Sequence, residues 1–322
     1  MLPPTQNSGA VPQLFGVFLR SIPVSTPLPC DFYIYIDEKP VLFKKTGDSI
    51  TSSRLKSLYK YRVTKLYIPI DQKMAFRKFM WGALTESRPS CNEEAAGIFR
   101  QTGFLLAEAL FTSSDPNEAI KKSSLFAKES TRFIGEEGWK SVRKIMTTIT
   151  HDDYSYNHAV NISALAMELT GKIFGESEQD VLWQAALGGF IHDIGERMVE
   201  LAILEKKEPL VKQEILKIQQ HPVIGAKFLE SLPKIPESSK RIVNEHHENF
   251  DGTGYPNGLT GEKIDILARI VSLCDVYDSL TSDRPYRQKL STKEALELMQ
   301  SMQPGRFDPT LLVVFLRIVK NN

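Results

Sequence analysis

The sequence predicts a mainly α-helical protein in which a small α+β domain precedes an all-helical domain. Two observations predict this class. Strand-like runs separated by turn signals occur only in about the first hundred residues, and from about Cys91 onward apolar side chains recur with the period of an α-helix. We therefore expect a small α+β domain over residues 1–90, a helical linker over 91–139 and a helical domain over 140–322.

The N-terminal part follows a polar, proline-containing tail. Its four strand-like runs read "QLFGVFLR", "DFYIYID", "PVLFKK" and "TKLYIPI", and a short helical pattern lies around "SSRLKSLYKY". The segment has no histidine, and its charges are spread along it. Nothing in it indicates catalysis, so we expect a regulatory or dimerising role, with a homodimer as one outcome.

The remaining chain reads as successive helices. Amphipathic runs such as "EEAAGIFRQTGFLLAEAL" and "EAIKKSSLFAKESTRFI" have the helical period. Ser291 and Glu294 form a capping-box pattern, and Asp308 before Pro309 marks another helix start. These signals are structural and carry no functional weight.

Composition limits the classes of function. Forty basic and thirty-nine acidic side chains give a net charge of +1, so no overall field attracts nucleic acid polymers or anionic membranes. The cysteines at 30, 91 and 274 form no CxxC pattern, which favours a reducing compartment. Signal-peptide features and long apolar stretches are missing from the sequence, and we expect a cytoplasmic protein.

The histidines are the first sign of chemistry. All six lie between positions 151 and 247, and each is at or next to a predicted helix end. One such histidine alone is most often a capping or surface residue. Five together with Asp193 and a further aspartate would supply a site for two metal ions, because imidazole binds transition metals and a carboxylate can bridge them. Zinc held by cysteines is not expected, since the cysteines have no ligand spacing.

A series of motifs resembles one family. The chain resembles the HD-GYP domain, a subclass of the HD phosphohydrolase superfamily, over about residues 140–318. The motifs that carry the resemblance are "YSYNHAVNIS", "HDIGE", "HPVIG", "HHENFDGTGYP" and "LCDVYDSLTSDRPYR". It implies an all-helical domain that holds two, sometimes three, iron or manganese ions and hydrolyses cyclic di-GMP. The resemblance of the N-terminal part to segments that precede such domains is weak.

The resemblance also implies which residues hold the ions. One ion would be held by His158, His192, Asp193 and Asp275, and the second by Asp193, His221, His246 and His247. His151 matches no ligand. Tyr154 stands where some members place a glutamate that helps to hold a third ion, so we expect two transition-metal ions, iron or manganese. Glu248 and Asp251 are expected to orient the imidazoles.

The stretch "HHENFDGTGYPNG" forms the family's GYP loop. Gly252, Gly254 and Gly258 would allow a tight, partly left-handed backbone path after the paired histidines. Tyr255 would lie at the pocket rim, where its ring could stack on a guanine or donate a hydrogen bond to it, and the alternative is a packing role. The resemblance also makes this loop a candidate contact for partner proteins such as GGDEF-domain proteins.

The substrate contacts are expected in "RPYR". Arg284 and Arg287 are one helical turn apart and could bind phosphate oxygens, although a pair of surface arginines is the alternative. The family usually has a lysine after "HDIG", but this chain has Glu196. A carboxylate there would repel a phosphodiester that an ammonium would attract, a difference of a few kcal/mol at an effective dielectric of about 20. Either activity is then reduced, or Arg284 and Arg287 compensate. Alternatively, Glu196 binds a metal or carries a proton.

The expected reaction is cleavage of cyclic di-GMP to pGpG, with GMP as a further product. Two ions roughly 3.5 to 4 Å apart would hold a bridging hydroxide and direct it at phosphorus, and Asp193 would set their geometry. Two alternatives stay open. The domain could instead bind cyclic di-GMP or a partner protein with little turnover, or it could hydrolyse another nucleotide phosphate.

Overall fold

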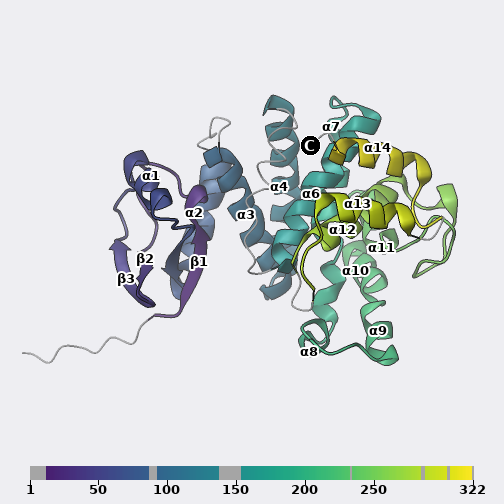
Figure 1. Cartoon of the computed structure of the whole chain (residues 1–322), viewed down its shortest axis with the longest axis horizontal. Helices are drawn as coiled ribbons and strands as arrows, with labels where there is room; N and C mark the ends of the chain where they lie inside the picture. Colours follow the sequence, from purple (N-terminus) through teal and green to yellow (C-terminus); the bar gives the residue numbers. More distant parts are fainter. Residues whose placement is uncertain are drawn as a thin grey trace, which may run out of the picture. The chain divides into compact units, whose positions relative to one another are not determined.

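The computed structural model describes residues 12–86, 93–137, 154–232, 234–283, 287–302 and 305–320 (Figure 1). Contacts divide the chain into one unit over residues 1–102 and another over 103–322. The predicted class is confirmed, since strands occur only in the first unit and helices dominate the rest of the described chain. Within the described residues, no helix has the length and apolar character needed to cross a membrane. The predicted boundaries at residues 90 and 139 remain a proposal.

The first unit contains an antiparallel sheet in the order β1-β4-β2-β3. Its strands are β1 (Leu14–Phe18), β2 (Phe32–Ile36), β3 (Lys39–Lys44) and β4 (Lys65–Pro69). Three of them lie within the runs predicted from sequence, β3 begins one residue before its run, and α1 (Ser52–Lys60) occupies the predicted helical stretch. A second helix, α2 (Lys73–Thr85), buries Phe76 and Met80. The sequence analysis did not identify it.

The second unit is helical throughout its described residues. Helix α3 (Glu93–Thr112) begins in the first unit and ends in the second. The helices that follow are α4 (Pro116–Glu137), α6 (Tyr154–Phe174), α7 (Gln179–Ile191), α8 (Leu201–Leu204), α9 (Lys212–Ile218), α10 (His221–Glu230), α11 (Glu237–Glu245), α12 (Ile266–Thr281), α13 (Thr292–Ser301) and α14 (Pro309–Lys320). Short 3-10 turns η3 (Ile194–Met198) and η4 (Gly261–Lys263) interrupt the connections.

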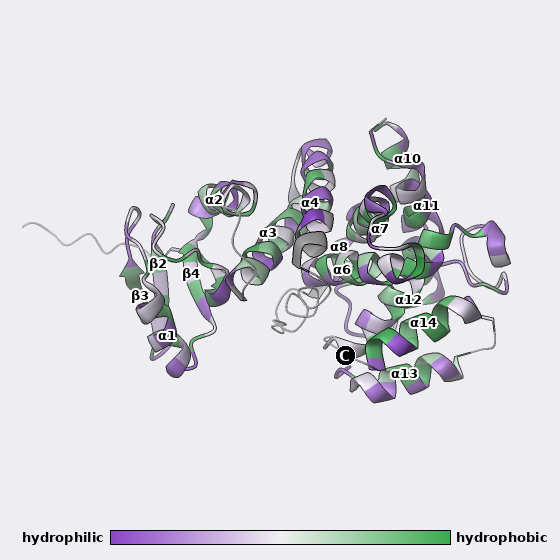
Figure 2. Cartoon of the chain, turned by 90° about the horizontal axis from the view of Figure 1, so that it is seen from above, coloured by the Kyte–Doolittle hydropathy of each residue, from purple (hydrophilic) through white to green (hydrophobic). Residues whose placement is uncertain are grey.

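Helices α6, α7 and α12 form the centre of this unit. Helix α7 packs against α4, α6 and α11, and α12 packs against α6, α11 and α13. Figure 2 shows hydrophobic residues along α6 and α12. Leu169 of α6, Leu273 of α12 and Phe315 of α14 belong to one buried cluster. Burial of this apolar surface fixes the ends of several helices next to one another.

The helix starts follow the predicted caps with one difference. Ser291 and Glu294 form the capping box of α13, and Asp308 accepts hydrogen bonds from two backbone N–H groups in the first turn of α14. The sequence predicts His158 at or next to a helix end, and the run "AVNISALAMELTGKIFG" that follows it is the expected helix, whereas α6 already begins at Tyr154 and contains His158. The aromatic and polar residues before His158 are therefore helical.

Candidate metal centre

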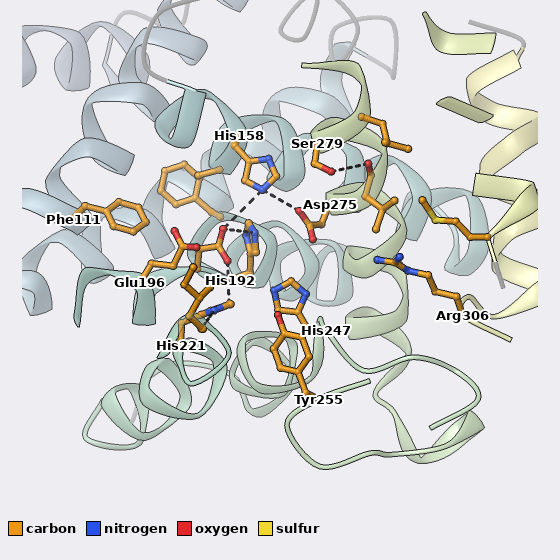
Figure 3. Close-up of a pocket in the computed structure, with 17 residues that line it drawn as sticks. Phe111, His158, His192, Glu196, His221, His247, Tyr255, Asp275, Ser279 and Arg306 are labelled. Atoms are coloured by element: carbon orange, nitrogen blue, oxygen red, sulfur yellow. Dashed lines mark hydrogen bonds and ion pairs between the residues drawn. The ribbon is translucent and has the colours of Figure 1, made fainter. Parts of the chain in front are cut away.

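Five histidines gather at one site, and four of them line its pocket: His158, His192, His221 and His247 (Figure 3). His158 lies on α6, His192 directly follows α7 and His221 opens α10, while His246 and His247 follow α11. With two aspartates they form two groups of potential ligand atoms, each group lying within 4.8 Å. The first group is His158, His192 and Asp275, and the second is Asp193, His221, His246 and His247. The structure thus brings together all seven residues predicted as ligands.

Hydrogen bonds to backbone carbonyl groups orient three of the imidazole rings. The Nδ1 atoms of His192, His221 and His246 each lie within 3.0 Å of a backbone carbonyl oxygen, on Gly189, Ile218 and Val243 respectively. Carbonyl oxygens only accept, so each Nδ1 donates its proton. Each Nε2 then presents a lone pair to the pocket, which is how metal-binding histidines are commonly held.

Asp193 lies between the two groups with one carboxylate oxygen toward each. Its Oδ2 is 3.0 Å from Nε2 of His192 and 3.9 Å from Nε2 of His158. Its Oδ1 is 3.4 Å from Nε2 of His221 and 3.5 Å from Nε2 of His246. This is the arrangement expected of a carboxylate that bridges two ions.

The donor atoms fit cations better than they fit one another. Nε2 of His221 and Nε2 of His246 are 3.2 Å apart, although the Nδ1 atom of each ring already carries the proton. Two lone pairs at this distance repel unless a positive charge lies beside them. Nε2 of His192 is buried and accepts no hydrogen bond among the described residues. The two clusters are consistent with a binuclear metal site.

Charge within the site also favours cations. Burial opposes ionisation of Asp193, but the neighbouring histidines, His192 first, hold its pKa well below the usual range. Burial lowers the pKa of His158, yet hydrogen bonds to Asp275 and Asp278 outweigh it and raise that pKa to about 10. Burial, with repulsion from His246, lowers the pKa of His247. The carboxylates of Asp193 and Asp275 thus attract positive charge, and His247 offers a neutral nitrogen.

Asp278 is a site residue that the sequence analysis missed. Its Oδ2 accepts from Nδ1 of His158 at 2.7 Å, and its Oδ1 accepts from the amide of Asn161 at 2.7 Å. Asp278 is buried and lies on α12, three residues after Asp275. That helical spacing, which places both carboxylates on one face, was the available signal. Asp278 orients the ring of His158.

A close backbone approach brings Asp193 to His221. Gly195 lies in η3 against the first turn of α10, where an added Cβ would be 2.0 Å from the carbonyl oxygen of His221. Any side chain at this position would separate η3 from α10. The close packing of η3 against α10 therefore requires a glycine after the "HDI" residues.

The GYP loop takes the predicted path for two different reasons. Gly252 and Gly258 have φ values of +84° and +62°, in the left-handed region. Gly254 is needed for space, because an added Cβ would be 2.2 Å from the backbone nitrogen of Asn249. The resulting turn brings Tyr255 back over His247, and the two rings stack with centroids 4.8 Å apart.

The acidic residues of this loop do not orient imidazoles as predicted. Glu248 is buried and accepts from the backbone N–H groups of Asn257 and Leu259 at 2.7 and 3.0 Å. Asp251 accepts from the backbone N–H and the hydroxyl of Thr253. Both carboxylates therefore stabilise the conformation of the loop, because they accept hydrogen bonds from later residues of the same loop.

The pocket above the ligands has a volume of about 470 Å³, within the usual range for small-molecule sites. Tyr255 and Glu196 both line it. Because one face of the Tyr255 ring rests on His247, a base could use only its other face or its hydroxyl. Burial, followed by repulsion from Asp193, raises the pKa of Glu196 to about 7. Glu196 belongs to neither group of potential ligands.

Of the two predicted arginines, only Arg287 lies within the described residues. Arg284 and His151 lie outside the described residues, as does the side chain of Tyr154. Arg287 donates to the carbonyl oxygens of Ser279 and Leu280 at the end of α12 and does not line the pocket. Its contact with substrate remains a prediction. The arginine that does line the pocket is Arg306, which the sequence analysis did not identify.

Comparisons with known proteins agree with this geometry. A family model described as "HD domain" matches residues 146–311. A solved structure, the "HDG'Y'P protein" Bd1817 from Bdellovibrio bacteriovorus, is similar in fold, with a TM-score of 0.69 at 21% identity over 96% of this chain and 100% of that chain.

Several curated relatives are also similar. A cyclic di-GMP phosphodiesterase from Pseudomonas aeruginosa, PA4108, is 38% identical over 53% of this chain and 40% of its own length. The 3′3′-cGAMP-specific phosphodiesterase 3 of Vibrio cholerae is 33% identical over 48% of this chain and 33% of its own. The response regulator RpfG of Xanthomonas campestris, a cyclic di-GMP phosphodiesterase, is 28% identical over 62% of this chain and 54% of its own length. The chain thus spans about half or less of each relative.

Proposed function

This chain belongs to the HD-domain family, and from that premise we propose that it is a metal-dependent phosphodiesterase of cyclic dinucleotides. We further propose cyclic di-GMP as the substrate, pGpG as the product and GMP as the product of continued cleavage. The resemblance of the motifs to HD-GYP proteins is confirmed by the matched family and relatives. The supporting observation is the position of Asp193, whose two oxygens face the two groups of imidazoles.

The proposed ligand sets are those predicted from the sequence. His158, His192 and Asp275 would hold one ion, the histidines at 221, 246 and 247 would hold the other, and Asp193 would join them. Two bound ions of the iron or manganese type supply Lewis-acid activation of water and neutralise charge on a phosphodiester. The chain's own residues hold the donors in place through the Nδ1 hydrogen bonds, so little reorganisation is required on binding.

The pocket wall would position the nucleotide. Tyr255 offers its outer face and hydroxyl, and Phe111 and Met302 add apolar surface on which a base could rest. The names of the relatives support cyclic dinucleotides as a class, and they include both cyclic di-GMP and 3′3′-cGAMP enzymes. We place cyclic di-GMP first because two of the three relatives described above carry that name.

One observation favours a second candidate function. Glu196 places a carboxylate in the pocket beside Asp193, where the substrate phosphate would have to approach. Such a domain could retain both ions and bind cyclic di-GMP or a partner protein with little turnover. Protein partners such as GGDEF-domain proteins, bound through the GYP loop, and a homodimer through the N-terminal unit belong to this reading as proposals.

A turnover experiment tests both candidates. Protein loaded anaerobically with Fe²⁺, or with Mn²⁺, is incubated separately with cyclic di-GMP, 3′3′-cGAMP and pGpG, and products are separated by liquid chromatography. The proposed enzyme should convert cyclic di-GMP to pGpG at a rate that depends on metal. Binding of cyclic di-GMP without product over hours would support the second candidate, and product from neither cyclic dinucleotide would contradict the first.

A further inference from the structure

The pocket contains one permanent cation on a wall away from Glu196. Among the described residues that line it, Arg306 is the only arginine or lysine. Figure 3 shows its guanidinium directed toward the histidine cluster, with Glu196 on the opposite side of that cluster. A phosphodiester bound over the histidines would therefore lie between an acidic side chain and a basic one.

The backbone around Arg306 is fixed to the loop that follows the paired histidines. The carbonyl oxygen of Arg306 accepts from the backbone N–H of Phe250 at 3.0 Å, and that of Gly305 accepts from the N–H of Asp251 at 2.8 Å. Gly305 has a φ of +100°, and a Cβ there would lie 2.8 Å from the Cβ of Asp251. The side chain of Arg306 thus starts from a defined position beside the site.

Within the described chain, the guanidinium of Arg306 lacks the carboxylate partner that Arg269 and Arg241 have. Arg269 pairs with Asp308 at 2.6 Å, and Arg241 pairs with Glu245 at 2.8 Å. Among the described residues, Arg306 forms no ion pair, and its Nε is buried without a hydrogen-bond partner. The Cζ atom of Arg306 lies 5.5 Å from the centroid of the Phe307 ring. A buried donor on a cation is costly unless an anion accepts from it.

From these observations we infer that Arg306 binds a phosphate of the cyclic dinucleotide and supplies the positive charge that Glu196 does not. This inference rests on the proposed function. The planar guanidinium suits two phosphate oxygens at once, through a pair of parallel N–H donors. Arg306 is a substrate-positioning residue. It belongs to neither group of potential metal ligands, so its loss should weaken binding of the nucleotide and leave the metal content intact.

The test compares Arg306→Gln and Arg306→Lys with a matched control, Arg317→Gln. Arg317 is exposed on α14, close in sequence, and does not line the pocket. All variants are loaded with Mn²⁺, and their metal content and melting temperature are measured. KM and kcat are determined for cyclic di-GMP and 3′3′-cGAMP, and Kd for cyclic di-GMP is measured by calorimetry. Bis(4-nitrophenyl) phosphate, a small phosphodiester without bases, reports whether the metal centre works.

We expect Arg306→Gln to raise KM and Kd for cyclic di-GMP by about 10- to 100-fold, the range for loss of a hydrogen bond to a charged group. Arg306→Lys should lose less, because it keeps the charge but not the planar fork. Metal content and the rate on saturating bis(4-nitrophenyl) phosphate should stay within about threefold of the parent protein. Arg317→Gln should leave every value unchanged.

Failure of this inference is distinguishable from failure of the proposed function. If the parent protein cleaves or binds cyclic di-GMP and Arg306→Gln does so with the same KM and Kd, only the role of Arg306 is overturned. Loss of metal in both Arg306 variants would also overturn it, because the arginine would then support the metal centre. If the parent protein neither binds nor cleaves a cyclic dinucleotide while it hydrolyses bis(4-nitrophenyl) phosphate, both proposals fail.

Discussion

The floor and the wall of the pocket are built differently. The floor consists of the seven potential ligands, and four of its five imidazoles are fixed by an Nδ1 hydrogen bond to a carbonyl or to Asp278. The wall includes single side chains from η3, the GYP loop and the segment before α14, among them Glu196, Tyr255 and Arg306. Because several hydrogen bonds hold each part of the floor, we expect a substitution there to abolish metal binding and activity together. A substitution in the wall should instead change the affinity for substrate by a limited factor.

The largest expected effect is that of Asp193→Ala in the floor. Among the described residues, Asp193 is the only side chain with an oxygen toward each group of imidazoles, and its removal leaves two cationic centres without a shared anion. Metal content should fall to near zero and activity by at least about 1000-fold, because several kcal/mol of charge stabilisation are lost. Elemental analysis and the turnover assay measure both.

Asp180→Ala, at an exposed position in the first turn of α7, is the matched control for that change. It should retain both ions and full activity. An Asp193→Ala variant that retained both ions and its rate would show that Asp193 is not the bridge.

Asp278→Asn should weaken one of the two metal sites of the floor more than the other. Asp278 accepts from both His158 and Asn161, and an asparagine can accept only on its single carbonyl oxygen. Loss of such an orienting partner typically costs about 10- to 100-fold in metal affinity or activity. The ion held by His158 should be lost first. Titration of the apo-protein with Mn²⁺ would show one tight and one weakened site.

His247→Ala is the counterpart in the other half, and it should weaken the second ion preferentially. The metal retained by each variant should therefore have a different environment, which electron paramagnetic resonance of Mn²⁺ can distinguish. Identical loss of both ions in both variants would indicate that the halves do not bind independently.

Glu196→Lys tests the wall and has two outcomes of opposite sign. We expect kcat/KM to rise by about 10- to 100-fold, because an attraction replaces a repulsion and each 1.36 kcal/mol is worth about tenfold. The assay is run at pH 8, above the pKa of about 7 that burial and Asp193 give this carboxyl, so that the parent residue is ionised. Glu196→Gln, which removes charge without adding any, should give a smaller rise.

We favour the gain because both groups of potential ligands form without Glu196. Loss of metal together with activity in Glu196→Lys would contradict this view and would assign Glu196 to the metal or to proton transfer.

The smallest expected effect is that of Glu248→Gln, which loosens the GYP loop. The buried carboxylate accepts from two backbone N–H groups, and a glutamine can satisfy only one of them well. A cost of about 1 to 3 kcal/mol should lower the melting temperature by roughly 2 to 10 °C for a unit of this size. KM should rise slightly, since Tyr255 moves with the loop, and both ions should remain.

Glu262→Gln, at an exposed position in η4, is the control for Glu248→Gln and should change neither value. Loss of a metal ion in Glu248→Gln would instead show that the loop supports His247 as part of the floor.

The sequence by itself determined the fold class and the residues of the floor. Strands and helices follow from local periodicity, as in β2 and α13, and the kind of metal ligand is a property of the side chain. His192 and Asp193 are adjacent in the chain, and so are His246 and His247, so local backbone alone presents them as pairs. The recognisable motifs are local in the same sense.

Only the tertiary structure decided which residues orient the metal ligands and which side chains form the pocket wall. Asp278 holds a histidine 120 residues away in sequence, and no local pattern states that pairing. Arg287 is occupied by the carbonyl groups at the end of α12, whereas Arg306 is brought to the pocket through its backbone bond to Phe250. Which loop reaches a given wall depends on how distant helices pack. The burial of their apolar faces decides this, and it involves the whole unit rather than any single stretch of chain.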